Sequence, residues 1–244
     1  MAATASAPYQ KFAGVYDSLM DQQQFYESYY NFIVEVLQKL NFNPKNILDL
    51  GCGTGKLAEI FLRSGYEIEG LDLSEAMLTI ARKRGLKVHH GNMAYFSLGK
   101  KYGLIASIFD SINYLQSAPQ LQKCFGRVYG HLDNDGLFIF DVNSDYKINE
   151  YIPNVNKTVH YEIGNTGIVW ENFHKPDTWI AKITIAEGGR KYFEEHVEKA
   201  YSLETIRALL EKSGFVIAGV YGDFEFNKVK KDSLKWFFVC RKLL

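Results

Sequence analysis

The stretch "ILDLGCGTGKL", residues 47–57, decides the fold. It begins with a short apolar run that contains Asp49, and it continues into three glycines that alternate along the chain, Gly51, Gly53 and Gly55. An apolar run followed by a glycine-rich turn and a helical pattern predicts a strand, a tight loop and a helix. In α/β proteins this arrangement holds a nucleotide, and the spacing of the residues indicates which kind.

Two phosphate-binding loops fit this spacing poorly. The phosphate-binding loop G-x-x-x-x-G-K-[ST] requires glycine where Leu50 stands and a hydroxyl where Leu57 stands. The dinucleotide motif G-x-G-x-x-G requires a third glycine where the chain has Lys56. Asp49 would also add negative charge next to two phosphates.

The remaining alternative is a nucleoside without phosphate. "D-x-G-x-G-x-G" after a first strand resembles the motif of class I S-adenosylmethionine-dependent methyltransferases. The resemblance implies that Asp49 acts on the cationic methionine portion of S-adenosyl-L-methionine, directly or through water. The glycines let the backbone approach the cofactor closely because they have no Cβ. Asp72 follows Gly51 by about twenty residues, which places its carboxylate to accept hydrogen bonds from the ribose hydroxyls.

The resemblance also implies the other cofactor contacts. Asn92 stands where the family usually has an acidic residue for the adenine amino group, and its amide oxygen still accepts one hydrogen bond. Met93 would pack on one adenine face and Met77 on the other, although Met77 equally suits a core position. The predicted cofactor-binding set is Tyr9, Asp49, Gly51, Gly53, Gly55, Asp72, Leu73, Met77, Asn92, Met93 and Phe109.

Strand and helix patterns alternate up to residue 142. Strands are predicted at residues 47–50, 66–71, 86–90, 104–109 and 137–142, with helices at 22–40, 56–64, 74–84 and 117–131 between or before them. This alternation predicts a parallel sheet covered by helices on both faces. From 155 to 200 four strand-like stretches separated by hairpin signals predict an antiparallel insert. A helix at 202–212 and strands at 215–221 and 236–240 close the chain.

We therefore expect an α/β fold, with a Rossmann-like seven-stranded methyltransferase sheet flanked by helices and a small antiparallel β insert. The predicted division has an N-terminal lid and helix (1–45), a Rossmann-like cofactor-binding domain (46–150 and 201–244) and the insert (151–200), which forms the acceptor side.

Further segments narrow the resemblance. "YQKFAGVYDSLM" (9–20) looks like the lid of small-molecule methyltransferases, and "FDSINYL" (109–115) and "HVEKAYSLETIRALLEKSGF" (196–215) match the same group. This subset includes bacterial amino-sugar N-methyltransferases. It implies methyl transfer to a small-molecule acceptor, with nitrogen favoured over oxygen and S-adenosyl-L-homocysteine as the product.

The candidate catalytic residues are Tyr16, Asn113 and His196. By resemblance, Tyr16 in the lid would close over the sulfonium and the acceptor, and Asn113 and Tyr114 would lie near the acceptor. Glu194, His196 and Glu198 share one face of a predicted strand, where the histidine can accept a proton. The alternative is a solvated polar face.

Three aromatic side chains of the insert are candidates for the acceptor pocket. They are Trp170, His174 and Trp179. Trp179 alternates with apolar residues and equally suits the buried face of the insert.

Composition limits the partners. The chain has 28 basic and 28 acidic residues, so its net charge is zero, which argues against nucleic acid. The three widely spaced cysteines favour a reducing compartment and argue against structural zinc, and no metal site is predicted.

No apolar run approaches the roughly eighteen residues of a membrane span, and the N-terminal residues lack a signal-peptide pattern. We expect a cytoplasmic monomer or homodimer.

Two other functions remain open. The same fold serves non-catalytic cofactor-binding or interaction modules. A methyltransferase acting on protein or RNA is a further alternative, although the motif [ND]-P-P-[YF] of enzymes that modify nucleic-acid amino groups is missing.

Overall fold

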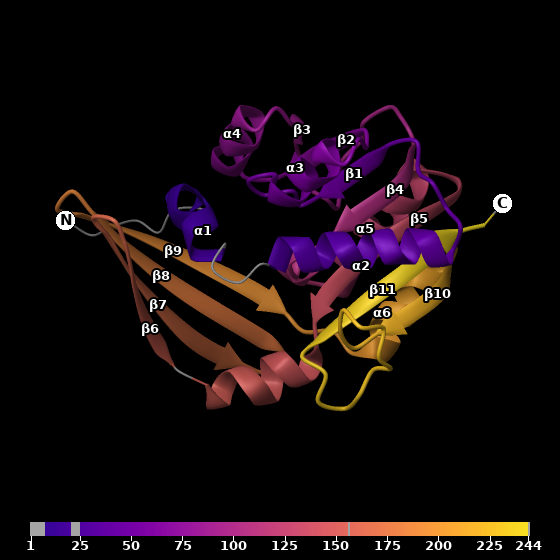
Figure 1. Ribbon diagram of the computed structural model, residues 1–244. Helices are drawn as coiled ribbons and strands as arrows, with labels where there is room; N and C mark the ends of the chain where they lie inside the picture. The colour runs from indigo at the N-terminus through magenta and orange to yellow at the C-terminus, as the bar shows by residue number, and fades with distance from the viewer. Residues whose placement is uncertain (1–7, 21–24, 156, 244) are drawn as a thin grey trace.

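The computed structural model describes residues 8–20, 25–155 and 157–243. Within these ranges the chain forms a seven-stranded sheet flanked by helices and a separate four-stranded antiparallel sheet (Figure 1). The fold class predicted from the sequence is thereby confirmed. In the same ranges, no helix has the length and apolar character that crossing a bilayer requires.

The seven-stranded sheet has the order β10-β11-β5-β4-β1-β2-β3. Its strands are β1 (Ile47–Leu50), β2 (Ile68–Asp72), β3 (Lys87–His90), β4 (Tyr102–Ser107), β5 (Leu132–Asn143), β10 (Phe215–Tyr221) and β11 (Lys235–Lys242). Strands β1 to β5 are parallel, and β11 lies antiparallel between β5 and β10. The chain leaves β1 toward β2 and returns to its other side with β4. A crevice for a ligand is expected where this order reverses, outside the carboxyl ends of the strands.

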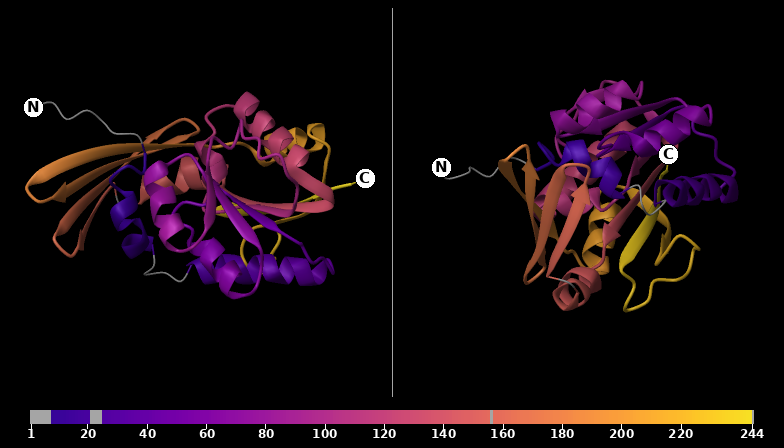
Figure 2. Two further views of the ribbon diagram at one scale, coloured as in Figure 1. Left: turned by 90° about the horizontal axis from the view of Figure 1, so that it is seen from above. Right: turned by 60° about the vertical axis from the view of Figure 1, so that its left-hand side comes forward.

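Helices cover both faces of this sheet (Figure 2). They are α2 (Phe25–Lys39), α3 (Lys56–Arg63), α4 (Glu75–Lys83), α5 (Ala118–His131) and α6 (Leu203–Lys212). The apolar stripes of α2, α3 and α4 pack in one core, and those of α5 and α6 pack in the other. Ser74, Ser117 and Ser202 cap their helices by accepting hydrogen bonds from backbone N–H groups. The helix predicted from residue 22 begins at Phe25, and residues 22–24 lie outside the described ranges.

The insert is an antiparallel sheet with the order β6-β7-β8-β9. Its strands are β6 (Thr158–Ile163), β7 (Thr166–Lys175), β8 (Thr178–Glu187) and β9 (Arg190–Lys199). Short helical turns η3 (Lys147–Tyr151) and η4 (Ile152–Asn154), which the sequence patterns did not predict, lead into it. Residue 156, within the predicted first strand, lies outside the described ranges.

Helix α1 (Ala13–Met20), a second element that the patterns did not predict, lies between the insert and the seven-stranded sheet (Figure 1). Phe12 and Leu19 pack against Ile168, Ile183 and Ile185 of the insert. We call residues 8–20 the lid segment.

The interpretation of the β9 polar face as solvated is wrong. Glu194, His196 and Glu198 are only 2%, 4% and 5% exposed. Strand pairing explains this burial, because His196 lies opposite Ala181 and Glu198 lies opposite Trp179. The polar residues therefore share the face that packs against the lid segment, and sequence alternation within one strand cannot reveal this register.

Candidate functional site

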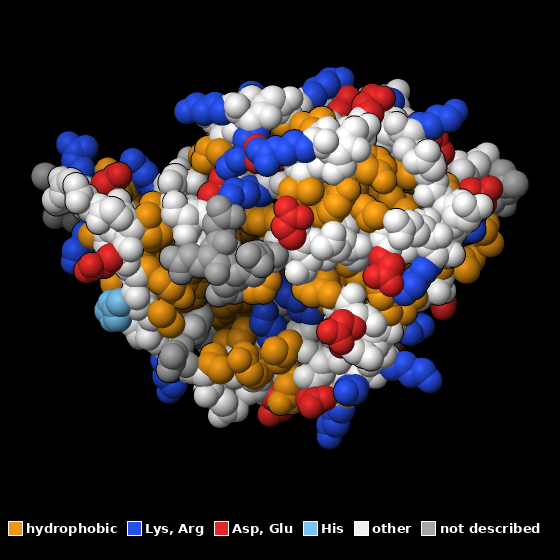
Figure 3. Space-filling model, viewed as in Figure 1, with side chains coloured by type: hydrophobic (Ala, Val, Ile, Leu, Met, Phe, Trp, Pro, Cys, Tyr) orange, Lys and Arg blue, Asp and Glu red, His pale blue; other side chains and the backbone are white. Residues whose placement is uncertain are grey.

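Two cavities meet beside the carboxyl ends of β1, β2 and β4. The first has a volume of about 250 Å³ and the second of about 320 Å³. Four aromatic residues line both cavities: Tyr9, Tyr16, Phe109 and Tyr114. The surface is hollowed on this face, where lysine or arginine side chains lie among hydrophobic ones (Figure 3). Two ligands could therefore meet at an aromatic boundary.

The glycine turn shapes the wall of the first cavity. Gly51 and Gly53 have φ angles of +81° and +52°, a region that side chains disfavour. A Cβ on Gly51 would lie 2.8 Å from Oγ of Ser111. Gly53 has open space where its Cβ would stand, so the backbone can contact a ligand there. Gly55, which was predicted to bind the cofactor, does not line the cavity. A Cβ at this position would crowd Ala81, so the observed role of Gly55 is to let the turn pack closely against α4.

Asp49 is a buried carboxylate without a partner. It is 1% exposed and lines the first cavity, and neither of its oxygens has a hydrogen-bond partner among the described residues. Burial, assisted by the charge of Asp72, raises the pKa of Asp49 to about 7. An isolated buried carboxylate is costly unless a cation or hydrogen-bond donor satisfies it. The arrangement fits a ligand with a positively charged group.

Asp72 ends β2 and also lines the first cavity. Its Oδ2 accepts a hydrogen bond from the Gly53 N–H and its Oδ1 accepts one from the Ser74 N–H, each at 2.8 Å. Burial raises the pKa of Asp72, and these backbone donors act in the opposite direction. A carboxylate oxygen can accept a further hydrogen bond, so Asp72 both fixes the turn and can accept from two ligand hydroxyls.

The remaining predicted residues surround the far end of this cavity. Leu73 is 63% exposed, whereas Met77 is buried, and both line the cavity with Asn92 and Met93. Oδ1 of Asn92 already accepts a hydrogen bond from the Ala94 N–H at 2.8 Å. Asn92 therefore offers its Nδ2 donors and one remaining lone pair to a ligand.

A chain of polar contacts crosses the aromatic boundary. The hydroxyls of Tyr9 and Tyr114 are 2.7 Å apart, and the Tyr114 hydroxyl is 3.0 Å from Nδ1 of His196. Nε2 of His196 lies 3.3 Å from Oε2 of Glu194, without an aligned hydrogen bond. Burial raises the pKa of Tyr9, Tyr16 and Tyr114 well above the usual value, so these phenols are neutral near pH 7.

Glu194 also fastens the lid segment. Its carboxylate accepts hydrogen bonds from the N–H groups of Tyr9, Lys11 and Phe12 at 2.7, 2.6 and 3.0 Å. Burial alone would raise the pKa of Glu194, but His196 and these backbone donors lower it below the usual value. Oγ of Ser74 donates to the carbonyl of Tyr9 at 3.1 Å, so the lid segment is held from both sides. The sequence pattern placed Glu194 beside His196 but gave no signal of this contact.

Strand β4 ends in a strained turn. Phe109 and Asp110 have φ angles of +55° and +54°, which is unusual for two consecutive side-chain-bearing residues. Asp110 forms an ion pair with Lys235, with Oδ1 2.6 Å from Nζ. The ion pair holds the turn and presents Phe109 to both cavities.

Asn113 lines neither cavity and is fully buried. Its Nδ2 donates to the carbonyls of Asn143 and Lys199 at 3.1 and 3.0 Å, and its Oδ1 accepts from the Asn143 N–H at 2.9 Å. These contacts join η2 (Ser111–Tyr114), β5 and β9. They favour a structural role, and its catalytic role stays a prediction.

Both insert tryptophans line the second cavity. Nε1 of Trp170 and Nε1 of Trp179 donate to Oδ1 of Asn172 at 2.9 and 3.0 Å. His174 is exposed and does not line this cavity. Trp179 was predicted to lie either in a pocket or on the buried face of the insert. Both descriptions apply, because the buried face of the insert also forms a wall of the second cavity.

Comparisons with known proteins agree with this geometry. A methyltransferase domain model matches residues 47–136. The crystal structure of an S-adenosylmethionine-dependent methyltransferase from Clostridium acetobutylicum ATCC 824 is 30% identical and has a TM-score of 0.84, covering 97% of this chain and 99% of that chain. This chain belongs to the S-adenosylmethionine-dependent methyltransferases.

Two relatives extend the comparison. A protein of Geobacillus sp. (strain WCH70) is 28% identical over 96% of this chain and 99% of its own length. The dTDP-3-amino-3,4,6-trideoxy-alpha-D-glucopyranose N,N-dimethyltransferase of Streptomyces venezuelae is 32% identical over 132 residues, which are 53% of this chain and 56% of that protein.

The family resemblance carried by the glycine motif is thereby confirmed, and S-adenosylmethionine is the cofactor. The first cavity fits it. The unpartnered carboxylate of Asp49 suits its cationic groups, and the open backbone at Gly53 admits a close contact.

Proposed function

We propose that the protein transfers a methyl group from S-adenosylmethionine to an amine nitrogen of a small-molecule acceptor. The observation that carries this proposal is the pair of cavities that meet at Tyr9, Tyr16, Phe109 and Tyr114. One cavity has the cofactor motif, and the other has room for a second, compact molecule. The relative from Streptomyces venezuelae, named as an amino-sugar N,N-dimethyltransferase, supports nitrogen as the accepting atom.

The cofactor residues have separate proposed roles. When bound, the cofactor supplies a methyl group that its sulfonium already activates. Asp49 balances the positive charge of the methionine portion, and Asp72 accepts the ribose hydroxyl hydrogen bonds. Leu73, Met77, Asn92 and Met93 surround the adenine.

The boundary residues position the acceptor and exclude water. Tyr9 and Tyr16 come from the lid segment, so the reaction space is complete only while that segment is in place. Their neutral hydroxyl oxygens can accept weak contacts from a positively charged methyl group. Alignment of this kind can supply several kcal/mol of the barrier.

The acceptor side is assigned to the insert and the lid segment, because Trp170, Trp179 and His196 line the second cavity. The proton that the nitrogen releases passes to the Tyr114 hydroxyl as that hydroxyl gives its own proton to Nδ1 of His196, 3.0 Å away, and Glu194 beside Nε2 balances the charge of the ring. An amine needs only to lose a proton near neutral pH, whereas a hydroxyl needs a stronger base. Since the neighbouring phenols are neutral, the site favours nitrogen over oxygen.

Calorimetric titration with S-adenosylmethionine and S-adenosylhomocysteine tests the cofactor assignment. Both should bind, and Asp72→Ala should weaken both by about tenfold or more, since it removes two hydrogen bonds to a charged acceptor. Asp232→Ala, which changes an exposed residue outside both cavities, is the matched control.

A screen of amines, amino sugars and carboxylates for S-adenosylhomocysteine release then tests transfer. Release with an amine supports the proposal. Tight cofactor binding without release from any acceptor would favour a non-catalytic module, and release with carboxylates alone would exclude nitrogen.

A further inference from the structure

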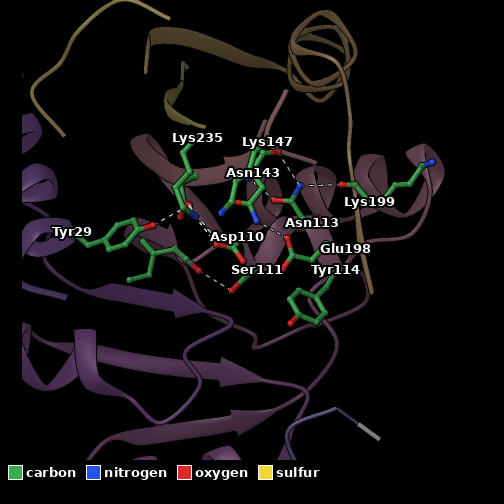
Figure 4. Close-up of polar contacts among 12 residues, drawn as sticks. Tyr29, Asp110, Ser111, Asn113, Tyr114, Asn143, Lys147, Glu198, Lys199 and Lys235 are labelled. Carbon is green, nitrogen blue, oxygen red and sulfur yellow. Dashed lines mark hydrogen bonds and ion pairs between the residues drawn. The ribbon is translucent and has the colours of Figure 1, made fainter. Parts of the chain in front are cut away.

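A mixed-charge cluster lines part of the second cavity, and Figure 4 shows the polar contacts among its members. Its cavity-lining members are Asp110, Lys147, Glu198 and Lys235, and Asp141 lies behind them. They come from five separate parts of the chain: the end of β4, β5, η3, β9 and the start of β11. Charged groups gathered here need either one another or a ligand.

Lys235 is satisfied by its neighbours. Its Nζ donates to Oδ1 of Asp110 and to Oδ2 of Asp141, both at 2.6 Å. Tyr29 also donates to Oδ2 of Asp141 at 3.0 Å. Lys235 is shared between the two carboxylates, and burial raises the pKa of Asp141, so the ammonium chiefly offsets the charge of Asp110 and weakens its repulsion of an incoming anion.

The surroundings of Glu198 favour its uncharged form. It is 5% exposed, and its Oε2 accepts from Nδ2 of Asn143 at 2.6 Å. Burial and the nearby charge of Asp110 raise the pKa of Glu198 well above its usual value. This shift favours the protonated form of Glu198, which adds no negative charge to the cavity.

Lys147 is the cluster member with unused donors. Its ammonium has three N–H groups, and its hydrogen-bond partner in the described part of the chain is Oδ1 of Asn143 at 2.7 Å, an uncharged amide. The Trp179 ring centroid lies 5.9 Å from the same Nζ, a contact that uses no N–H donor in a hydrogen bond. No carboxylate oxygen of the described residues lies within ion-pair distance of Nζ. Burial and the charge of Lys235 lower the pKa of Lys147, whereas the charges of Asp110, Glu198 and Asp141, which lie near but not in contact, act in the opposite direction.

We propose that Lys147 binds an oxyanion of the acceptor, so that the acceptor is an amine that also bears a carboxylate or a phosphate. This inference rests on the proposed function, since it names a feature of the same acceptor. Trp170 and Trp179 bound the cavity on the insert side and suit the apolar body of such a molecule. A charged oxygen matches the free N–H donors better than a hydroxyl, because it adds Coulombic attraction to the hydrogen bond with the ammonium.

The test uses matched anionic and neutral probes. The S-adenosylhomocysteine-bound protein is titrated by calorimetry with benzoate and benzamide for the carboxylate arm, and with phenyl phosphate and phenol for the phosphate arm. At least one anion should bind tenfold or more tightly than its neutral partner, and the arm in which this occurs identifies the source of the oxyanion.

Lys147→Met should reduce that preference to less than threefold while S-adenosylhomocysteine binding stays unchanged. Lys199→Met, a change at a lysine that does not line the cavity, should retain it. A wild-type protein without anion preference in either arm, or a preference that survives Lys147→Met, overturns the inference. If the wild-type protein fails to bind S-adenosylhomocysteine, that result counts against the proposed function. The anion titration can then be made without the product cofactor, and it still tests the role of Lys147.

Discussion

The hydroxyl oxygen of Tyr114 lies 3.0 Å from Nδ1 of His196, and it joins the lid segment to the insert because the Tyr9 hydroxyl lies 2.7 Å from the same oxygen.

His196→Phe keeps a ring against Phe12 but removes both nitrogens. With an acceptor from the amine screen, we expect kcat to fall on the order of 100-fold, as for loss of a general base. Cofactor affinity should stay within about threefold, because His196 does not line the first cavity. Single-turnover kinetics and calorimetry measure the two effects, and an unchanged kcat would remove His196 from the mechanism.

Asp49→Asn should raise the stability of the ligand-free protein and lower its affinity for the cofactor. The pKa of Asp49 is raised to about 7, so the folded state retains a proton that the unfolded state loses above about pH 4. In the ligand-free wild type, stability therefore falls as pH rises from about 4 to 7, and the full penalty is present above pH 7. The asparagine variant should be more stable than wild type at pH 8, by up to about 4 kcal/mol.

The same substitution should weaken S-adenosylmethionine binding, most strongly above pH 7, where the wild-type carboxylate is ionised. Urea unfolding at pH 5 and pH 8, with calorimetry at both values, checks this pair of effects. Equal affinity in both proteins at pH 8 would show that Asp49 does not face the cationic part of the cofactor.

Glu194→Ala should release the lid segment. It removes the acceptor of the Tyr9, Lys11 and Phe12 N–H groups, and buried charged hydrogen bonds contribute about 1.5–3 kcal/mol each. Proteolysis within residues 8–20 should become at least tenfold faster, and S-adenosylmethionine should dissociate faster. Glu195→Ala is the matched control, since Glu195 is exposed on the opposite face of β9. Equal cleavage of the two variants would contradict this role of Glu194.

Glu69→Gln should remove an acid-sensitive contribution to stability. Burial alone would raise the pKa of Glu69, but hydrogen bonds from Lys100, Lys87, His89 and Tyr102 lower it to about 2. The unfolded chain then binds more protons than the folded chain between about pH 2 and 4.5, so this contribution is complete above pH 4.5 and is lost as pH falls toward 2.

The glutamine variant should lose about 2–3 kcal/mol at pH 7, and its difference from wild type should shrink below pH 4. Urea unfolding at several pH values measures this loss. Exposed Glu67 provides the control, and a pH-independent difference between wild type and the variant would exclude an ionic origin.

Local sequence patterns predicted which residues gather around the first cavity, because the parts that form it are short and consecutive. The run of residues 47–57 contains the strand, the turn and the start of α3, and Asp72 follows at the end of the next strand. Parallel strands bring their carboxyl ends to one edge, so these residues had to lie close together. The placement of Leu73, Asn92 and Met93 around the first cavity follows from the same rule.

The contacts around the second cavity could not be predicted in the same way. Lys235 contacts Asp110 across 125 residues of sequence, and Glu194 contacts the Tyr9 N–H across 185. Both contacts depend on how the insert and the last strands pack against the rest, which no local periodicity encodes. Asn113 shows a contact of the same kind: its predicted catalytic role remains untested, but its side chain ties together three elements that no local pattern links.

The grip of Glu194 on the lid segment also has a consequence for the order of assembly during synthesis. Residues 9–12 leave the ribosome long before their anchor, which follows them by 182 to 185 residues. Until β9 has been translated and paired, the carboxylate that orders these residues is absent. A ribosome-bound chain truncated before residue 194 should therefore expose this segment, even where the glycine turn has already folded.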